Sequence, residues 1–167
     1  MRERPLRSAE AFVSNLTFLA FDFGERRIGV ALGNDLTETA NPLIAIDAIN
    51  DDARFTAISA LVKEWGPSAF VVGRPSHPDG KPHAMTARCE KFARQLTGRF
   101  DRPTHLVDER YTSVDAAQAL AGTGSRLSRQ ERKKAIDAEA AAQILRRFFD
   151  EGAMPVTATV AEVSKTS

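Results

Sequence analysis

Short apolar runs separated by polar turns open the chain, and longer segments with apolar residues every three or four positions follow them. The runs 17–21 and 28–32 flank a turn at 24–26, which is typical of two antiparallel strands. A third run, 42–46, begins with proline, whose missing N–H is tolerated at the start of a strand. The first third of the chain therefore predicts a three-strand meander.

Helices alternate with strands after this meander. Asn50 is expected to cap a helix that carries apolar residues on one face and ends at Gly66. The apolar positions between 85 and 96 predict a second helix, with Gly98 expected to end it. The short apolar runs beside these helices predict two further strands, at residues 69–72 and 104–107.

Two capping patterns predict the last helices. Thr112-x-x-Asp115 is a variant capping box that opens a short helix ending near Gly122. Ser128-x-x-Glu131 is a complete capping box, and it opens the longest helix, which runs to about Asp150.

The order of these elements predicts one α/β domain, in which helices flank a mixed five-stranded sheet. This domain is expected to span residues 17–152. Residues 1–16 are interpreted as a flexible N-terminal leader, and residues 153–167 as a disordered C-terminal tail without helical periodicity.

Composition is that of an ordinary globular domain. The chain has 167 residues, 43% of them hydrophobic, and a net charge of +1, so a nucleic-acid site would have to come from local clusters of basic residues. The single cysteine, Cys89, excludes an internal disulfide and suits a reducing compartment. No long apolar run predicts a membrane span or a secretory signal. We therefore expect a cytoplasmic protein with no membrane partner.

Acidic residues follow the ends of two predicted strands. Asp22 follows the first strand, and Asp108 and Glu109 follow the fifth; Asp137 shares a face of the last helix with apolar residues. In open α/β sheets, functional groups gather beyond the carboxyl ends of strands. If the acids converge, each pair of charges about 4 Å apart repels by roughly 4 kcal/mol, which a divalent cation would relieve. Oxygen ligands favour Mg²⁺ or Mn²⁺, and such ions can promote phosphodiester hydrolysis.

Simpler interpretations of these acids remain open. Asp22 can cap its own turn, and Asp137 can be an acid favoured by the positive end of a helix dipole. Asp108 and Glu109 cannot be separated by sequence, because neighbours on a strand point to opposite faces.

Basic residues lie near the acids in the sequence. One cluster, residues 126–134, precedes Asp137, and three further cations lie beside strand ends: Arg74, Lys81 and Arg110. Such a rim suits the phosphate backbone of a nucleic acid. A solvated helix face explains the 126–134 cluster equally well.

Four sequence motifs occur in order along the chain. They are Asp22-x-Gly24-x-x-Arg27-Ile-Gly-Val-Ala31, Val72-Gly-Arg-Pro75 with Asp79-Gly80, Asp108-Glu-Arg-Tyr-Thr112, and Ile136-Asp137-x-x-Ala140-Ala141-x-x-Ile144-Leu145. On these motifs, residues 17–150 resemble the YqgF/RuvX-like family of RNase H-like fold, whose members are described as pre-16S rRNA nucleases and as Holliday-junction-resolvase-like proteins.

The resemblance implies a Mg²⁺- or Mn²⁺-dependent nuclease that matures the 5′ end of pre-16S rRNA. It implies that Asp22, Glu109 and Asp137 are the catalytic carboxylates and metal ligands, with Asp108 as an additional candidate ligand. The residues expected to contact nucleic acid are Arg27, Arg74, Lys81, Arg110, Arg126 and Arg129. The expected partners are precursor rRNA, or branched DNA, and a ribosomal precursor particle, bound by a monomer or a homodimer.

Other functions stay open at this point. A resolvase of DNA junctions would require a symmetric dimer, because two strands must be cut. A small phosphotransferase would use the turn after Asp22 to hold phosphate, and a non-catalytic RNA-binding module would keep the fold without needing Asp22.

Overall fold

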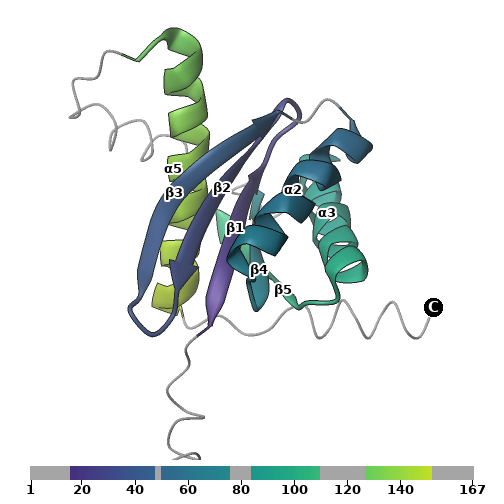
Figure 1. Ribbon diagram of the computed structural model, residues 1–167, viewed down its shortest axis with the longest axis vertical. Coiled ribbons are helices and arrows are strands. Elements are labelled where there is room, and N and C mark those ends of the chain that lie inside the picture. Colours follow the sequence, from purple (N-terminus) through teal and green to yellow (C-terminus); the bar gives the residue numbers. More distant parts are fainter. Residues whose placement is uncertain (1–15, 48–49, 76–83, 110–126, 152–167) are drawn as a thin grey trace, which may run out of the picture.

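The computed structural model describes residues 16–47, 50–75, 84–109 and 127–151 (Figure 1). In chain order, the described elements are β1 (Thr17–Phe23), β2 (Arg27–Asn34), β3 (Thr39–Asp47), α2 (Asp51–Trp65), β4 (Ala69–Pro75), α3 (Ala84–Phe100), β5 (Thr104–Glu109) and α5 (Arg129–Glu151). Within these residues, no helix is long and apolar enough to cross a membrane.

The strands form one five-stranded sheet in the order β3-β2-β1-β4-β5. β1 pairs antiparallel with β2, and β2 with β3, which confirms the predicted meander. β4 pairs parallel with β1, and β5 with β4. The mixed five-stranded sheet expected from the sequence is therefore confirmed, and β1 is its central strand.

The alternation of side chains along β1 divides the core into two layers. Leu19, Phe21 and Phe23 belong to the apolar cluster that includes residues of α2 and α3. Phe18 and Ala20 belong to the cluster formed with α5 on the other face. Figure 1 shows α5 on one side of the sheet and α2 with α3 on the other. The same alternation carries Asp22 onto the α5 face.

The predicted helix caps are present. The Asn50 side chain accepts a hydrogen bond from the Ala53 N–H at 2.8 Å, and Gly66 ends α2 with a φ of 55°. At the start of α5, the Ser128 N–H donates to Glu131 at 2.9 Å, and the Glu131 N–H donates to the Ser128 hydroxyl at 3.1 Å. Local side-chain chemistry therefore fixes where these helices begin.

The prediction that Gly98 ends a helix was wrong. α3 continues through Gly98 to Phe100, and the left-handed residue that follows is Asp101, with a φ of 56°. A glycine inside a helix costs only about 1 kcal/mol. Packing offsets this cost, because the Phe100 ring lies against Phe70 with centroids 5.8 Å apart.

Several expectations concern residues outside the described ranges. They are the leader, the tail, most of the loop after β4 and the short helix expected from Thr112. Cys89 is described, and it is fully buried in the core between α3 and the sheet.

Candidate active site

Asp22 of β1 and Asp137 of α5 lie close together. The reason is that α5 crosses β2, the strand next to β1 in the sheet. Asp22 is opposite Gly29 in the β1–β2 register. A Cβ atom at Gly29 would overlap the backbone carbonyl of Asp137 and lie 3.1 Å from the Ala138 nitrogen. The missing side chain of Gly29 thus lets the α5 backbone reach the sheet, and this brings Asp137 next to Asp22.

Small residues on α5 allow the same close approach further along the helix. Ala138, Ala140, Ala141 and Ala142 are all buried. At Gly33, a Cβ atom would be 2.5 Å from the Leu145 side chain. The sequence analysis missed the part played by Gly29. A glycine inside a strand is itself a known sign of a closely approaching backbone.

The two carboxylates interact electrostatically. The pKa of Asp22 is raised from 3.8 to about 6, mainly by burial of the carboxyl group and in addition by the negative charge of Asp137. No described residue forms an ion pair with Asp22. Asp22 therefore has a negatively charged neighbour and no described ion-pair partner, an arrangement that a cation would stabilise.

Arg27 pairs with the second carboxylate. Its Nε donates to Asp137 Oδ2 at 2.6 Å, and both side chains are about one-quarter exposed (25%). The two residues are 110 positions apart in the sequence, which is why this contact could not be predicted from local patterns. Arg27 was expected to bind nucleic acid, and its described contact is with Asp137.

Asp108 lies on the other face of the sheet. Arg74 donates to Asp108 Oδ1 from Nε at 3.0 Å and from Nη2 at 2.8 Å, and its Nη1 donates to Glu90 of α3 at 3.0 Å. The structure therefore does not bring Asp108 to Asp22 and Asp137. Arg74, expected at a nucleic-acid surface, is held between two acids.

The remaining predicted residues fall into two groups. Glu109 is described only as the last residue of β5, where its backbone is in register with Pro75. Arg129 is exposed at the first position of α5. The other expected nucleic-acid contacts lie outside the described residues: Lys81, Arg110 and Arg126.

A metal site is only partly assembled by the described side chains. Among them, no group of three or more His, Cys, Asp or Glu residues could hold a metal ion. Asp22 and Asp137 provide two oxygen donors, which is the chemistry that hard divalent cations prefer. These donors fit a hard cation, provided that a third ligand comes from elsewhere in the chain.

The raised pKa of Asp22 predicts a pH-dependent stability in the absence of metal. In the folded protein, the Asp22 carboxyl group stays protonated up to about pH 6. In the unfolded chain, it loses its proton near pH 3.8. Stability should therefore fall as pH rises from about 4 to about 6, by roughly 2 kcal/mol for this group. Urea unfolding with a chelator present, at several pH values, measures this fall. Asp22→Asn should lack this contribution, and an identical pH profile in the variant would contradict the assignment.

The sheet order, the antiparallel meander and the helix that carries an acid against the central strands define an RNase H-like domain. The family model described as "RuvX: Holliday junction resolvase" matches residues 16–151. The chain belongs to this RuvX family, as the sequence motifs indicated.

Named relatives and one solved structure extend the comparison. A Burkholderia vietnamiensis protein named "Putative pre-16S rRNA nuclease" is 50% identical over 141 residues, covering 84% of this chain and 93% of its own. A Burkholderia thailandensis protein of the same name is 49% identical over 140 residues, covering 84% and 92%. The structure titled "T. thermophilus RuvC in complex with Holliday junction substrate" aligns with 15% identity and a TM-score of 0.47, over 81% of this chain and 94% of that chain.

Proposed function

We propose that this protein is a metal-dependent nuclease that hydrolyses a phosphodiester bond near the 5′ end of precursor 16S rRNA. The observation that carries the proposal is the meeting of Asp22 and Asp137 across Gly29, with the pKa of Asp22 raised to about 6. The name of the Burkholderia relatives supplies the substrate. We place the reaction in the cytoplasm, on the RNA of a ribosomal precursor particle, and assign it to residues 17–152.

Asp22 and Asp137 would hold Mg²⁺ or Mn²⁺. When bound, such an ion supplies Lewis-acid stabilisation of the phosphate charge and a lowered pKa for a water molecule. The part of the protein is to fix the carboxylates before the substrate arrives. The strand register fixes Asp22, and the close crossing of α5 over β2 fixes Asp137.

Glu109 is the third ligand that we propose. Val107 belongs to the apolar cluster on the α5 face, whereas Asp108 pairs with Arg74 on the α3 face. Strand alternation then assigns position 109 to the face of Val107, which is also the face of Asp22. This argument favours Glu109 over Asp108 as a partner of Asp22 and Asp137.

Arg27 acts, in this proposal, as a positioning residue. Its Nε holds Asp137 in one orientation, while no described residue accepts a hydrogen bond from its two terminal nitrogens. A guanidinium can donate to two partners through different edges. Arg27 is thus suited to orient Asp137 and to contact a phosphate oxygen of the RNA at the same time.

Substitution of Arg27 should affect metal use and not only the fold. Arg27→Ala is expected to lower the cleavage rate or the apparent metal affinity about 10- to 100-fold, because groups that orient ligands have effects of this size. Arg27→Lys should recover part of the loss, since it keeps the charge but not the fork. Cleavage measured across a Mn²⁺ titration separates metal affinity from rate. A wild-type cleavage rate together with wild-type metal dependence in Arg27→Ala would contradict the role.

The family description favours one second candidate, resolution of Holliday junctions. That reaction needs two active sites related by symmetry, and hence a dimer, whereas cleavage of an RNA end needs one. A precursor 16S rRNA fragment and a four-way DNA junction, each incubated with the protein and Mg²⁺ or Mn²⁺, test the two functions side by side. We expect cleavage of the RNA, and its loss in EDTA. Cleavage of the junction alone would overturn the RNA assignment, and cleavage of neither would overturn the nuclease proposal.

A further inference from the structure

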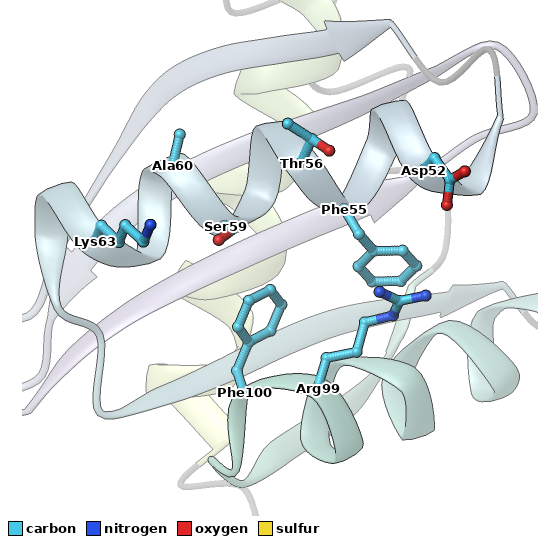
Figure 2. Close-up of a pocket in the computed structure, with 8 residues that line it drawn as sticks. All are labelled: Asp52, Phe55, Thr56, Ser59, Ala60, Lys63, Arg99 and Phe100. Carbon is cyan, nitrogen blue, oxygen red and sulfur yellow. The ribbon is translucent and has the colours of Figure 1, made fainter.

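A groove between α2 and α3 lies on the face of the sheet opposite to Asp22 and Asp137. It encloses about 660 Å³ and is open to solvent. Figure 2 shows it from the side, with α2 above and the end of α3 below. The lining residues that matter for the argument are Phe55, Thr56, Ser59, Lys63, Arg99 and Phe100. A volume of this size is typical of pockets that hold small organic ligands.

Arg99 is the central cation of this groove. Its guanidinium carbon lies 4.1 Å from the centroid of the Phe55 ring, and Phe55 itself is only 4% exposed. In Figure 2, the Arg99 side chain extends from α3 toward Phe55 of α2. Arg99 is exposed, and among the described residues none forms an ion pair or a hydrogen bond with its side chain. A guanidinium supported on one side by an aromatic ring can stack a nucleobase on its other side.

The other polar groups of the groove suit the rest of a nucleotide. Lys63 is exposed and has no ion pair with any described residue. Thr56 and Ser59 line the same side and can donate or accept hydrogen bonds. One acid, Asp52, also lines the groove, but Figure 2 shows it at the opposite end of α2 from Lys63. The groove therefore carries more positive than negative charge, which favours an anionic ligand.

We propose that this groove binds a nucleotide unit of single-stranded RNA. The base would stack on Arg99 beside Phe100, the phosphate would meet Lys63, and the hydroxyls of Thr56 and Ser59 would contact the sugar or the base edge. The proposal rests on the proposed nuclease function, because it assigns the groove to a part of the same RNA that is distant from the cleaved bond. A helix of a protein partner fits less well, because the apolar floor at Phe55 is covered by a cation.

The test uses the full-length chain with both groove cations neutralised. Lys63→Gln/Arg99→Gln should weaken binding of a fluorescently labelled single-stranded RNA about tenfold or more, because stacking and charge are lost together. The measurement is fluorescence anisotropy in an Asp22→Asn background, which prevents cleavage. The matched control is Lys91→Gln/Arg94→Gln, which removes two exposed cations of α3 that do not line the groove. Circular dichroism checks that both variants are folded.

A second readout locates the RNA directly. Ultraviolet cross-linking of 4-thiouridine RNA should label peptides that contain residues 55–63 or 99–100 in the parent protein, and not in Lys63→Gln/Arg99→Gln. Equal loss of affinity in the control pair, or cross-links only at other peptides, would overturn the proposal. If Lys63→Gln/Arg99→Gln keeps its affinity for RNA but no longer binds ribosomal precursor particles, the groove binds a protein instead. This result would also overturn the proposal. If RNA is cleaved normally while the groove binds none, only this inference fails; if wild-type protein cleaves no RNA, the nuclease proposal fails.

Discussion

Asp22→Asn is expected to reduce RNA cleavage by a factor on the order of a thousand while leaving the protein folded. Such a factor corresponds to about 4 kcal/mol of transition-state stabilisation, a size that fits loss of a metal ligand. Asparagine has nearly the same shape as aspartate, so the packing of β1 against α5 should survive. It removes, however, the charge that the proposed site needs most, since Asp22 interacts with Asp137 and forms no ion pair with a described residue.

Single-turnover cleavage of precursor 16S RNA, with Mg²⁺ and with Mn²⁺, measures this effect. Asp150→Asn is the control, because Asp150 is exposed near the end of α5. The cleavage rate of Glu109→Gln should fall as far as that of Asp22→Asn. Asp108→Asn should keep most of the activity, because Asp108 pairs with Arg74 on the other face of the sheet. Normal cleavage by Asp22→Asn would remove the nuclease assignment and favour a non-catalytic RNA-binding module.

Gly29→Ala should have the largest effect on stability. The added methyl group would overlap the backbone carbonyl of Asp137, and no rotation of a side chain can relieve an overlap between backbone and Cβ. We expect a loss of about 3 kcal/mol or more in the free energy of unfolding, at or above the upper end of ordinary overpacking. If the variant remains folded, α5 must move away from β2, which would separate Asp137 from Asp22 and lower cleavage as well.

Urea unfolding at constant pH measures the loss, and a second glycine gives a matched control. Gly98 lies inside α3, and a Cβ atom there would meet nothing within 4 Å. Gly98→Ala should therefore stabilise the protein by roughly 0.5–1 kcal/mol, since alanine favours a helix over glycine. Equal stability of Gly29→Ala and the wild type would show that α5 does not lie against β2 in solution.

Local signals in the sequence predicted most of the described helices and strands. The Asn50 cap, Gly66 and the Ser128–Glu131 box each act over three or four residues, so they can be recognised without knowing the fold. Gly98 failed as a signal because its effect is only about 1 kcal/mol, and the packing of Phe100 against Phe70 outweighs it. A weak local preference yields to tertiary contacts.

Contacts between distant segments could not be predicted from the same patterns. The choice between Asp108 and Glu109 depends on the face of β5 that meets α5, which the pairing of β5 with β4 decides. The pairing of Arg27 with Asp137 and the groove beside Arg99 depend on how helices cross the sheet.

The sequence by itself determined the strands, the helices with their caps, and which acids and cations were available for chemistry. Only the tertiary structure decided which of them meet: Asp137 reaches Asp22 because Gly29 leaves room for the backbone of α5. The reason is that caps and periodicity are local properties of the chain. Proximity across 110 positions, as between Arg27 and Asp137, is instead set by strand order and helix packing.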